Sequence, residues 1–359
     1  MKQWFIVLCL AIASLGATAA EEKKPLNTLP QGLGLPVMVR AGLNFIELQG
    51  ISENDGAFTA TVDVRLRWQD LRLAYPAAQF ASGYQEFVGS DAEKKLEEIW
   101  QPEVEFSNMK GDKTFQKRSL RIFPNGRVEM MQRTTASFNA DFSMENFPFD
   151  RQKLAVQLIS GSEPEQRVLF DFQQDELEFS NTQQGAQTEG WELGLVELSK
   201  DSVVAWRSER NTRMQAALVV KREQKSLLAT IFVPLFASLL IPLLVLWLNS
   251  VEDGNFTIDA FELTNISIGG LFAVVGLNFT VNSSFVKLAA GDNPVMRLFA
   301  LNYFLLGLSI ALCILLYRFN VVKRVFGPYI QEEFYGLINW AIPLLVFGTA
   351  TAIMALAIF

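Results

Sequence analysis

The chain has 359 residues, half of them hydrophobic, and a net charge of −7. This length allows about two domains, and the negative charge argues against a nucleic-acid partner. The sequence contains no histidine, which excludes histidine-based catalytic triads, histidine metal sites and histidine pH switches.

Residues 1–20 have the pattern of a secretory signal peptide. An apolar run, Trp4–Leu15, precedes the small residues Ala17-Thr18-Ala19, which suit a cleavage site. An uncleaved anchor helix is the alternative, but the run is short for a membrane span. Cleavage would place residues 21–222 outside the cytoplasm. One of the two cysteines lies in this segment and the other, Cys313, in a later apolar segment, so the exported domain has no disulfide.

The region that follows is predicted to be a β-sandwich. Apolar and polar residues alternate in Thr59–Trp68, which is the period of a half-buried strand. Pro124-Asn125-Gly126 predicts a hairpin turn, and Lys94–Trp100 predicts one helix after a capping box. Many short strands separated by turns favour a sandwich. The polar, Gln-rich stretch Phe172–Gly190 is predicted to be a flexible surface loop.

Four apolar segments come next, each long enough to cross a bilayer, which takes about 20 helical residues. They cover residues 227–248, 263–284, 295–318 and 334–359. The second is unlike the others because it carries Thr, Asn, Ser and Gly along its whole length. A spanning helix this polar must turn one face away from lipid. Water in a pore is the simplest partner, so we expect residues 223–359 to form a transmembrane pore domain.

Charge gives a partial test of the membrane topology. If the sandwich is exported, the loop between the third and fourth segments lies in the cytoplasm. That loop holds three basic residues, in agreement with the positive-inside tendency: Arg318, Lys323 and Arg324. Three basic residues on the outer side disagree with it: Lys221, Arg222 and Lys225. A large translocated domain overrides local charge, so we expect an inner (plasma) membrane protein with its N-terminal domain periplasmic or extracellular.

Four motifs in a fixed order carry a resemblance to a known family. They are Trp68-Gln69-Asp70, Trp100-Gln101-Pro102-Glu103, Phe147-Pro148-Phe149-Asp150, and Arg222 twelve residues before Pro234. Together with the four apolar segments, they resemble the pentameric ligand-gated ion channels of the Cys-loop receptor superfamily in their short prokaryotic form. The animal receptors close the third motif with two cysteines, and the matching positions here are Ala140 and Leu154, as expected of bacterial members.

The resemblance implies a fold, an assembly and an activity. The fold would be an all-β immunoglobulin-like extracellular sandwich followed by a four-helix transmembrane domain, in a homopentameric ring. Each chain would contact identical subunits and membrane lipid, conduct cations and respond to an extracellular agonist. The chain would not be an enzyme and would need no cofactor, apart from a possible regulatory divalent cation.

The resemblance also assigns the pore to the second apolar segment. Glu262 would form a ring of carboxylates at the cytoplasmic mouth and favour cations, although an interfacial charge with no such role is the alternative. The lumen would be lined by Asn265, Gly269, Phe272, Gly276, Phe279 or Thr280, and Ser283. The opposite stripe would pack against other helices: Ile266, Leu271, Val274 and Val281. A ring of Phe272 would close the pore by dewetting unless it packs between helices, and Gly269 and Gly276 would either widen the lumen or let helices approach.

The linker Asn249–Phe261 is longer than the family's usual turn, which leaves a rival register open. In that register the pore helix starts near Asn255 and places Glu252 or Asp253 at the mouth. It also puts Asp259 and Glu262 inside the membrane, at considerable cost, so we favour the register in which the helix covers 263–284 and Glu262 lies at the mouth.

Coupling between sandwich and helices is placed by the resemblance at their junction. The residues are Glu53 or Asp55, Phe147, Pro148, Phe149, Asp150, Arg222, Pro234 and the loop 282–297. Arg222 beside one or two carboxylates would form a half-buried ionic cluster, with either a switching or a purely structural role. Pro234 frees one backbone carbonyl and is expected to kink the first helix.

The agonist site would lie between neighbouring sandwiches. The residues implied by the resemblance are Arg65, Arg67, Trp100, Glu103, Arg133, Ile159, Trp206 and Arg207. The absence of aromatic residues around Ile159 makes an amine cage a poor expectation, and the stimulus stays open between protons, Ca²⁺, amines and other ligands. A divalent cation would use acidic loop residues: Glu103, Glu105, Asp175 or Glu178.

A second function class is a membrane-tethered binding or sensor protein whose helices only anchor and oligomerise it. That class predicts no ionic current and tolerance of leucine along the second segment. An enzyme is disfavoured because no nucleophile–base pair is visible and histidine is absent.

Overall fold

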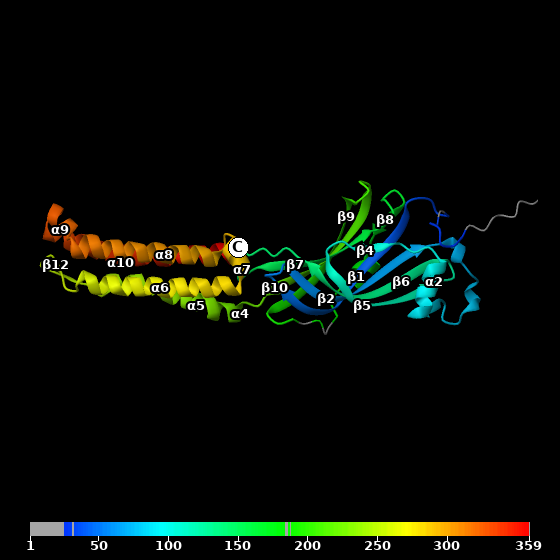
Figure 1. Cartoon of the computed structure of the whole chain (residues 1–359), viewed down its shortest axis with the longest axis horizontal. Coiled ribbons are helices and arrows are strands. Elements are labelled where there is room, and N and C mark those ends of the chain that lie inside the picture. The colour runs from blue at the N-terminus through cyan, green and yellow to red at the C-terminus, as the bar shows by residue number, and fades with distance from the viewer. Residues whose placement is uncertain (1–24, 31, 184–185, 187, 359) are drawn as a thin grey trace, which may run out of the picture.

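The computed structural model describes residues 25–358 except 31, 184, 185 and 187. The described chain is elongated, with a β-sandwich at one end and a helical bundle at the other (Figure 1). The predicted signal peptide and its cysteine lie outside the described residues. The end of the bundle that faces the sandwich is called here the proximal end, and the opposite end the distal end.

Two sheets form the sandwich, as predicted from the alternating pattern. One has six strands in the order β3-β5-β6-β2-β1-β8: Gln85–Val88, Met109–Ile122, Arg127–Asn139, Ala57–Gln69, Val37–Ser52 and Val168–Asp171. The other has four strands in the order β4-β7-β10-β9: Val104–Phe106, Arg151–Ser160, Arg210–Arg222 and Trp191–Val204. Inward-facing aromatic residues fill the space between the sheets. The ring of Phe138 lies 5.4 Å from that of Phe58 and 5.6 Å from that of Phe106.

The turn Pro124-Asn125-Gly126 joins β5 to β6, as the sequence predicts. Gly126 has a φ of 78°, and a Cβ atom there would lie 2.5 Å from the carbonyl oxygen of Asp70. Glycine is therefore required at this turn both by its conformation and by the close approach of the Asp70 backbone. The predicted helix near residue 94 is α2, Ser90–Glu98.

The stretch 172–190 is not the flexible surface loop that its composition predicted. It contains the short helix α3, Gln174–Phe179, and Glu176 in this helix is fully buried. The carboxylate of Glu176 pairs with Arg67 on β2, while Ser180 accepts a 2.9 Å hydrogen bond from the backbone N–H of Leu43 on β1. The prediction failed because a polar composition does not reveal that one of the acidic residues has an arginine partner far away in the sequence.

In the part of the chain that the structure describes, four helices are long and apolar enough to cross a membrane: Leu228–Trp247, Ala260–Ser284, Pro294–Arg318 and Pro328–Ile358. The first is α5 (Val233–Trp247), preceded by α4 (Gln224–Leu227) and a π-helical turn, Leu228–Phe232. The second is α6, followed by α7 (Val286–Ala290). The third is α8 (Pro294–Leu312), continued by a π-helical turn, Cys313–Arg318, and the fourth is α10, preceded by α9 (Val321–Phe326). These four helices fit a multi-pass membrane protein.

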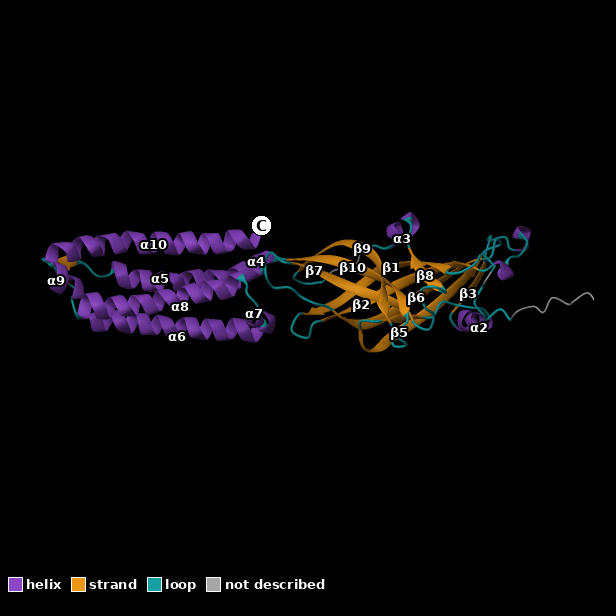
Figure 2. Cartoon of the chain, turned by 90° about the horizontal axis from the view of Figure 1, so that it is seen from above, coloured by secondary structure: helices purple, strands orange, loops and turns teal. Residues whose placement is uncertain are grey.

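Small polar side chains hold the helices together inside the bundle. Ser267 on α6 and Ser309 on α8 are buried and share a 2.9 Å hydrogen bond. The buried side chain of Asn302 on α8 bonds to Ser238 on α5. Such contacts satisfy polar groups that would otherwise face hydrocarbon. Figure 2 shows the helices side by side, with α9 at the distal end.

Candidate functional site

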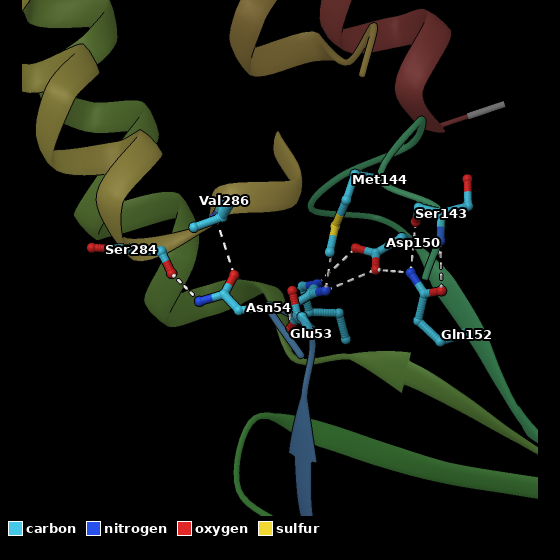
Figure 3. A network of polar contacts seen from close by, with 9 residues as sticks. Glu53, Asn54, Ser143, Met144, Asp150, Gln152, Ser284 and Val286 are labelled. Atoms are coloured by element: carbon cyan, nitrogen blue, oxygen red, sulfur yellow. Dashed lines mark hydrogen bonds and ion pairs between the residues drawn. The ribbon is translucent and has the colours of Figure 1, made fainter. Parts of the chain in front are cut away.

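The junction between the sandwich and the bundle is built around Arg222, the last residue of β10. Its guanidinium donates to Asp150 through Nε at 2.7 Å and Nη2 at 3.0 Å, and to Glu53 through Nη1 at 2.7 Å. The Arg222 and Asp150 side chains are only 4% and 3% exposed. Burial lowers the pKa of Arg222, but its hydrogen bonds to Asp150 and Glu53 outweigh burial and leave the pKa raised. The arginine is therefore a fixed charge held between the carboxylates of Glu53 and Asp150, which are labelled in Figure 3.

Two aromatic rings complete the surroundings of Arg222. Its guanidinium lies 4.2 Å from the ring centroid of Trp191 and 5.0 Å from that of Phe147. Asp150 also accepts a 2.6 Å hydrogen bond from Gln152. Because charge-assisted bonds and ring contacts surround the guanidinium, it holds the Phe147–Asp150 motif against the end of β10.

A second set of contacts joins the sandwich to the end of α6. The Asn54 side chain accepts a 3.1 Å hydrogen bond from the backbone N–H of Val286 and donates a 3.5 Å bond to the carbonyl of Ser284 (Figure 3). The Phe147 ring lies 5.6 Å from that of Phe285. One turn, Glu53–Asn54, therefore contacts both Arg222 and the end of the polar helix.

Only some of the residues expected to couple the sandwich to the helices contact one another at the junction. Of the two alternatives Glu53 and Asp55, the partner of Arg222 is Glu53, and Asp55 instead accepts a 2.6 Å bond from Ser52. Asn54 was missed by the sequence analysis because a lone asparagine in a turn has many ordinary explanations. Pro234 is the second residue of α5, just after the π-helical turn Leu228–Phe232.

The polar helix α6 exposes the residues proposed to line a lumen. Glu262, Asn265, Gly269, Phe272, Gly276, Phe279, Thr280 and Ser283 are all exposed in the single chain. Phe272 and Phe279 are 73% and 75% exposed. On the opposite side Val274 and Val281 are buried, as expected, together with Leu263, Ser267 and Gly270. Ile266 was expected on that packed side but is 39% exposed, because the buried line passes through Leu263 and Ser267 instead.

The glycines of α6 fall into two environments. A Cβ atom on Gly269 or Gly276 would meet no atom within 4 Å, whereas one on Gly270 would lie 2.7 Å from Ile241 and 3.1 Å from Leu306. Within one chain, Gly269 and Gly276 border open space. Gly270 is the glycine that lets α6 approach α5 and α8 closely.

We expect Gly270→Ala to lower the stability of the folded chain by about 1–3 kcal/mol, because the added methyl group overpacks the contact with α5 and α8. Gly269→Ala is the matched control, since alanine favours a helix and meets open space there. Thermal unfolding of the purified protein in detergent measures both. Equal unfolding temperatures for the two variants would contradict the close packing at Gly270.

At the distal end of the bundle, α6 begins at Ala260, about one turn before the expected start at Leu263. Asp259 is the N-cap, and its side chain accepts a 3.3 Å hydrogen bond from the N–H of Phe261. Glu262 lies in the first turn, where the helix dipole favours a carboxylate. The rival register is wrong, because residues 251–256 form a two-stranded hairpin, β11 (Val251–Glu252) and β12 (Asn255–Phe256), instead of helix.

A charged cavity of about 520 Å³ lies on the outer face of the six-stranded sheet. It is lined by Asp63, Arg65, Glu86, Val88, Lys117, Arg118, Ser119, Arg121, Glu129, Met131, Arg133 and Phe179. Arg133 is held by a bidentate pair with Asp63, with both contacts at 2.7 Å, which raises the pKa of Arg133. Hydrogen bonding to Glu86 likewise raises the pKa of Arg121. Five basic residues against three acidic ones give this face an excess of positive charge.

The remaining proposed ligand residues are scattered. Arg67 pairs with Glu176 and Asp175 and lines a smaller cavity away from Arg133. Trp100 is 7% exposed and packs edge-on against Trp68 at 6.0 Å, so it belongs to the core. Trp206 is 82% exposed, with the Arg207 guanidinium 4.8 Å from its ring. Ile159 is half-buried on β7, opposite Glu105 on β4, and Glu103 is exposed.

The acidic residues considered for a divalent cation do not gather within one chain. Asp175 pairs with Arg67 and shares α3 with Glu178, whereas Glu103 and Glu105 both border Gly161. Among the described residues, no group of three or more acidic or cysteine side chains is placed to hold a metal ion.

Comparisons with known proteins agree with this architecture. The family model for the neurotransmitter-gated ion-channel ligand binding domain matches residues 24–224, more than half of the chain. The proton-gated ion channel of Gloeobacter violaceus is 22% identical over 253 residues, which cover 70% of this chain and 65% of that protein. The gamma-aminobutyric acid receptor subunits rho-2 of Bos taurus and Rattus norvegicus are 34% and 33% identical over 133 residues, 36% of this chain and 27% of theirs.

The chain thus spans less than two thirds of the length of these relatives. The family match, however, covers the whole sandwich up to and including Arg222. The resemblance carried by the four sequence motifs is confirmed, and the chain belongs to the family of neurotransmitter-gated, or Cys-loop, ion channels through its ligand-binding domain.

Proposed function

We propose that the chain is a subunit of a homopentameric, ligand-gated cation channel of the inner (plasma) membrane. In this proposal the sandwich lies outside the cytoplasm and α6 lines the pore. The observation that carries it is the exposed polar side of α6, because a spanning helix with Asn265, Thr280 and Ser283 on one side needs water or protein there. A closed ring of identical subunits supplies a central aqueous channel.

The Arg222 junction supports coupling between an extracellular signal and the pore. Glu53 and Asn54 are neighbours in one turn. Glu53 contacts Arg222, and Asn54 contacts Ser284 at the end of α6 and Val286 at the start of α7. A movement of the sandwich would therefore reach the pore helix directly. The sensor alternative, in which the helices only anchor the protein, gives no role to this contact or to the exposed glycines of α6.

The charged cavity supports an agonist site on the outer face of the six-stranded sheet. Its surplus of arginine and lysine favours a ligand with an anionic group. Residues proposed to complete the site from a neighbouring subunit are Glu103, Ile159, Trp206 and Arg207. The proposal includes no cofactor, and protons or Ca²⁺ stay open as stimuli.

We expect Glu262→Gln to lower the cation-to-anion permeability ratio, because it removes the ring of carboxylates that concentrates cations at the cytoplasmic mouth. Reversal potentials in a sodium chloride gradient across a planar bilayer measure this ratio. Glu333→Gln is the matched control, since it removes the same charge from an exposed position near the start of α10. An unchanged ratio in Glu262→Gln would remove Glu262 as the filter, and no current under any stimulus would favour the sensor alternative.

A further inference from the structure

The linker between the first two spanning helices is a docked β-hairpin. Strands β11 and β12 are joined by Asp253 and Gly254, with φ values of 50° and 71°, as in a two-residue type I′ turn. The next pair outward is closed by Ser250 and Thr257, whose hydroxyls share a 2.9 Å hydrogen bond. This hairpin lies beside α9 at the distal end of the bundle (Figures 1 and 2).

The turn of the hairpin is bound by the start of the fourth spanning helix. Gln331, 1% exposed, donates a 3.1 Å bond to the Gly254 carbonyl, and Glu332 accepts a 3.3 Å bond from the Gly254 N–H. Lys323 on α9 donates a 2.6 Å bond to the Asn255 side chain. A Cβ atom on Gly254 would lie 2.4 Å from Pro328. The turn is thus in direct contact with α10 and has no room for a side chain.

The apolar side of the hairpin helps to form a hydrophobic core that is separate from the main one. Phe256 packs 4.4 Å from the ring of Tyr317 and 5.3 Å from that of Tyr335. Ala260 and Leu263, in the first turn of α6, are buried in the same cluster. The first turn of the pore helix therefore packs against a core that the hairpin and α10 complete.

Hydrogen bonds close the base of the hairpin and join it to α10. Asn249 is buried, and its side chain accepts a 3.0 Å bond from the Ile258 N–H, one residue before the N-cap Asp259. The Tyr335 hydroxyl donates to the carbonyl oxygens of Leu246 and Asn249. The backbone on both sides of the hairpin is therefore fixed with respect to α10. Glu262 lies between Ala260 and Leu263, and its direction depends on them.

We propose that residues 249–258, held by Lys323, Gln331, Glu332 and Tyr335, are a clamp that positions the first turn of α6 and thereby aims the Glu262 carboxylate at the pore mouth. Phe256 of the hairpin and Tyr335 of α10 are positioning residues that act through Glu262. This assignment rests on the proposed channel function, and it makes ion selectivity depend on the fourth helix, which does not itself line the pore.

A double-mutant cycle tests this positioning role. Phe256→Ala is expected to lower the cation-to-anion permeability ratio by about threefold or more in the parent and to change it little in Glu262→Gln, because residues acting through one another are non-additive. Phe326→Ala on α9, which removes a ring that is 65% exposed, is the control and should leave the ratio unchanged. Tyr335→Phe is the milder variant if Phe256→Ala does not assemble, since it keeps the ring and removes only the hydroxyl. Equal changes in both backgrounds would overturn the assignment.

A second readout separates failure of the clamp from failure of the channel proposal. In Glu262→Cys, the rate of reaction with a charged thiol reagent applied from the cytoplasmic side reports the position of that side chain without requiring selectivity. The parent protein, in which Cys313 is buried, gives the background rate. Adding Phe256→Ala to Glu262→Cys should change the rate about threefold or more, and an unchanged rate would overturn the clamp even if Glu262 proves to be the filter.

Discussion

Arg222→Met is expected to destabilise the folded subunit by about 3–5 kcal/mol, because it leaves the buried carboxylate of Asp150 without its positively charged partner. Asp150 is 3% exposed and receives two hydrogen bonds from Arg222. Glu53, 15% exposed, loses its bond at the same time. Thermal or denaturant unfolding of the intact protein in detergent measures the loss.

The neighbouring residue on the same strand supplies a matched control. Lys221→Met removes a charge whose contact with Glu192 is 3.7 Å long between side chains that are 46% and 67% exposed. An exposed pair of this kind contributes about 0–1 kcal/mol, so the control should unfold almost like the parent. Comparable losses in the two variants would show that burial of the Arg222 cluster is not what stabilises the junction.

Arg222→Lys separates charge from geometry at the same place. Lysine keeps the positive charge but lacks the planar fork that reaches Asp150 and Glu53 together. If the variant folds but no longer opens, the planar guanidinium of Arg222 has a role in coupling. If it opens normally, Arg222 is a purely structural residue.

Arg67→Met has a comparable expected effect, about 3–5 kcal/mol, because it leaves Glu176 buried in α3 without its main partner. Burial lowers the pKa of Arg67, but its hydrogen bonds and attraction to Glu176 and Asp175 leave the pKa raised. Burial and the charge of Arg67 lower the pKa of the neighbouring Arg65, whose guanidinium is 3.7 Å from Glu176. Arg65 is thus placed as a weaker substitute for Arg67.

Loss of Arg67 should also release α3 from the sheet, since the Arg67–Glu176 pair joins them. Hydrogen exchange at the backbone amides of residues 174–180 reports this release. Arg133→Met, which breaks a pair whose arginine is 47% exposed, is the control and should leave exchange in α3 unchanged. Normal protection of α3 in Arg67→Met would show that Arg65 or packing of Phe179 is sufficient to hold the helix.

Periodicity and composition in the sequence determined the sandwich, the β5–β6 turn and the four spanning helices. These features depend on local rules, because alternation of apolar residues specifies a strand and a run of apolar residues specifies a span. The placement of Asp150 and Arg222 at the junction was predicted only from the resemblance to a family. In each case the sequence identified which residues are buried or charged.

Only the tertiary structure decided which of those residues meet. It paired Arg222 with Glu53 and not with Asp55, and it placed Asn54 against the end of α6. It also buried Glu176 of α3 against Arg67 and docked the 251–256 hairpin on α10. Each of these contacts joins segments far apart in the chain, and the same acidic residue is solvated or buried according to whether an arginine is placed beside it. Local pattern gives no information about that placement, because it is set by how the two sheets and the helices pack together.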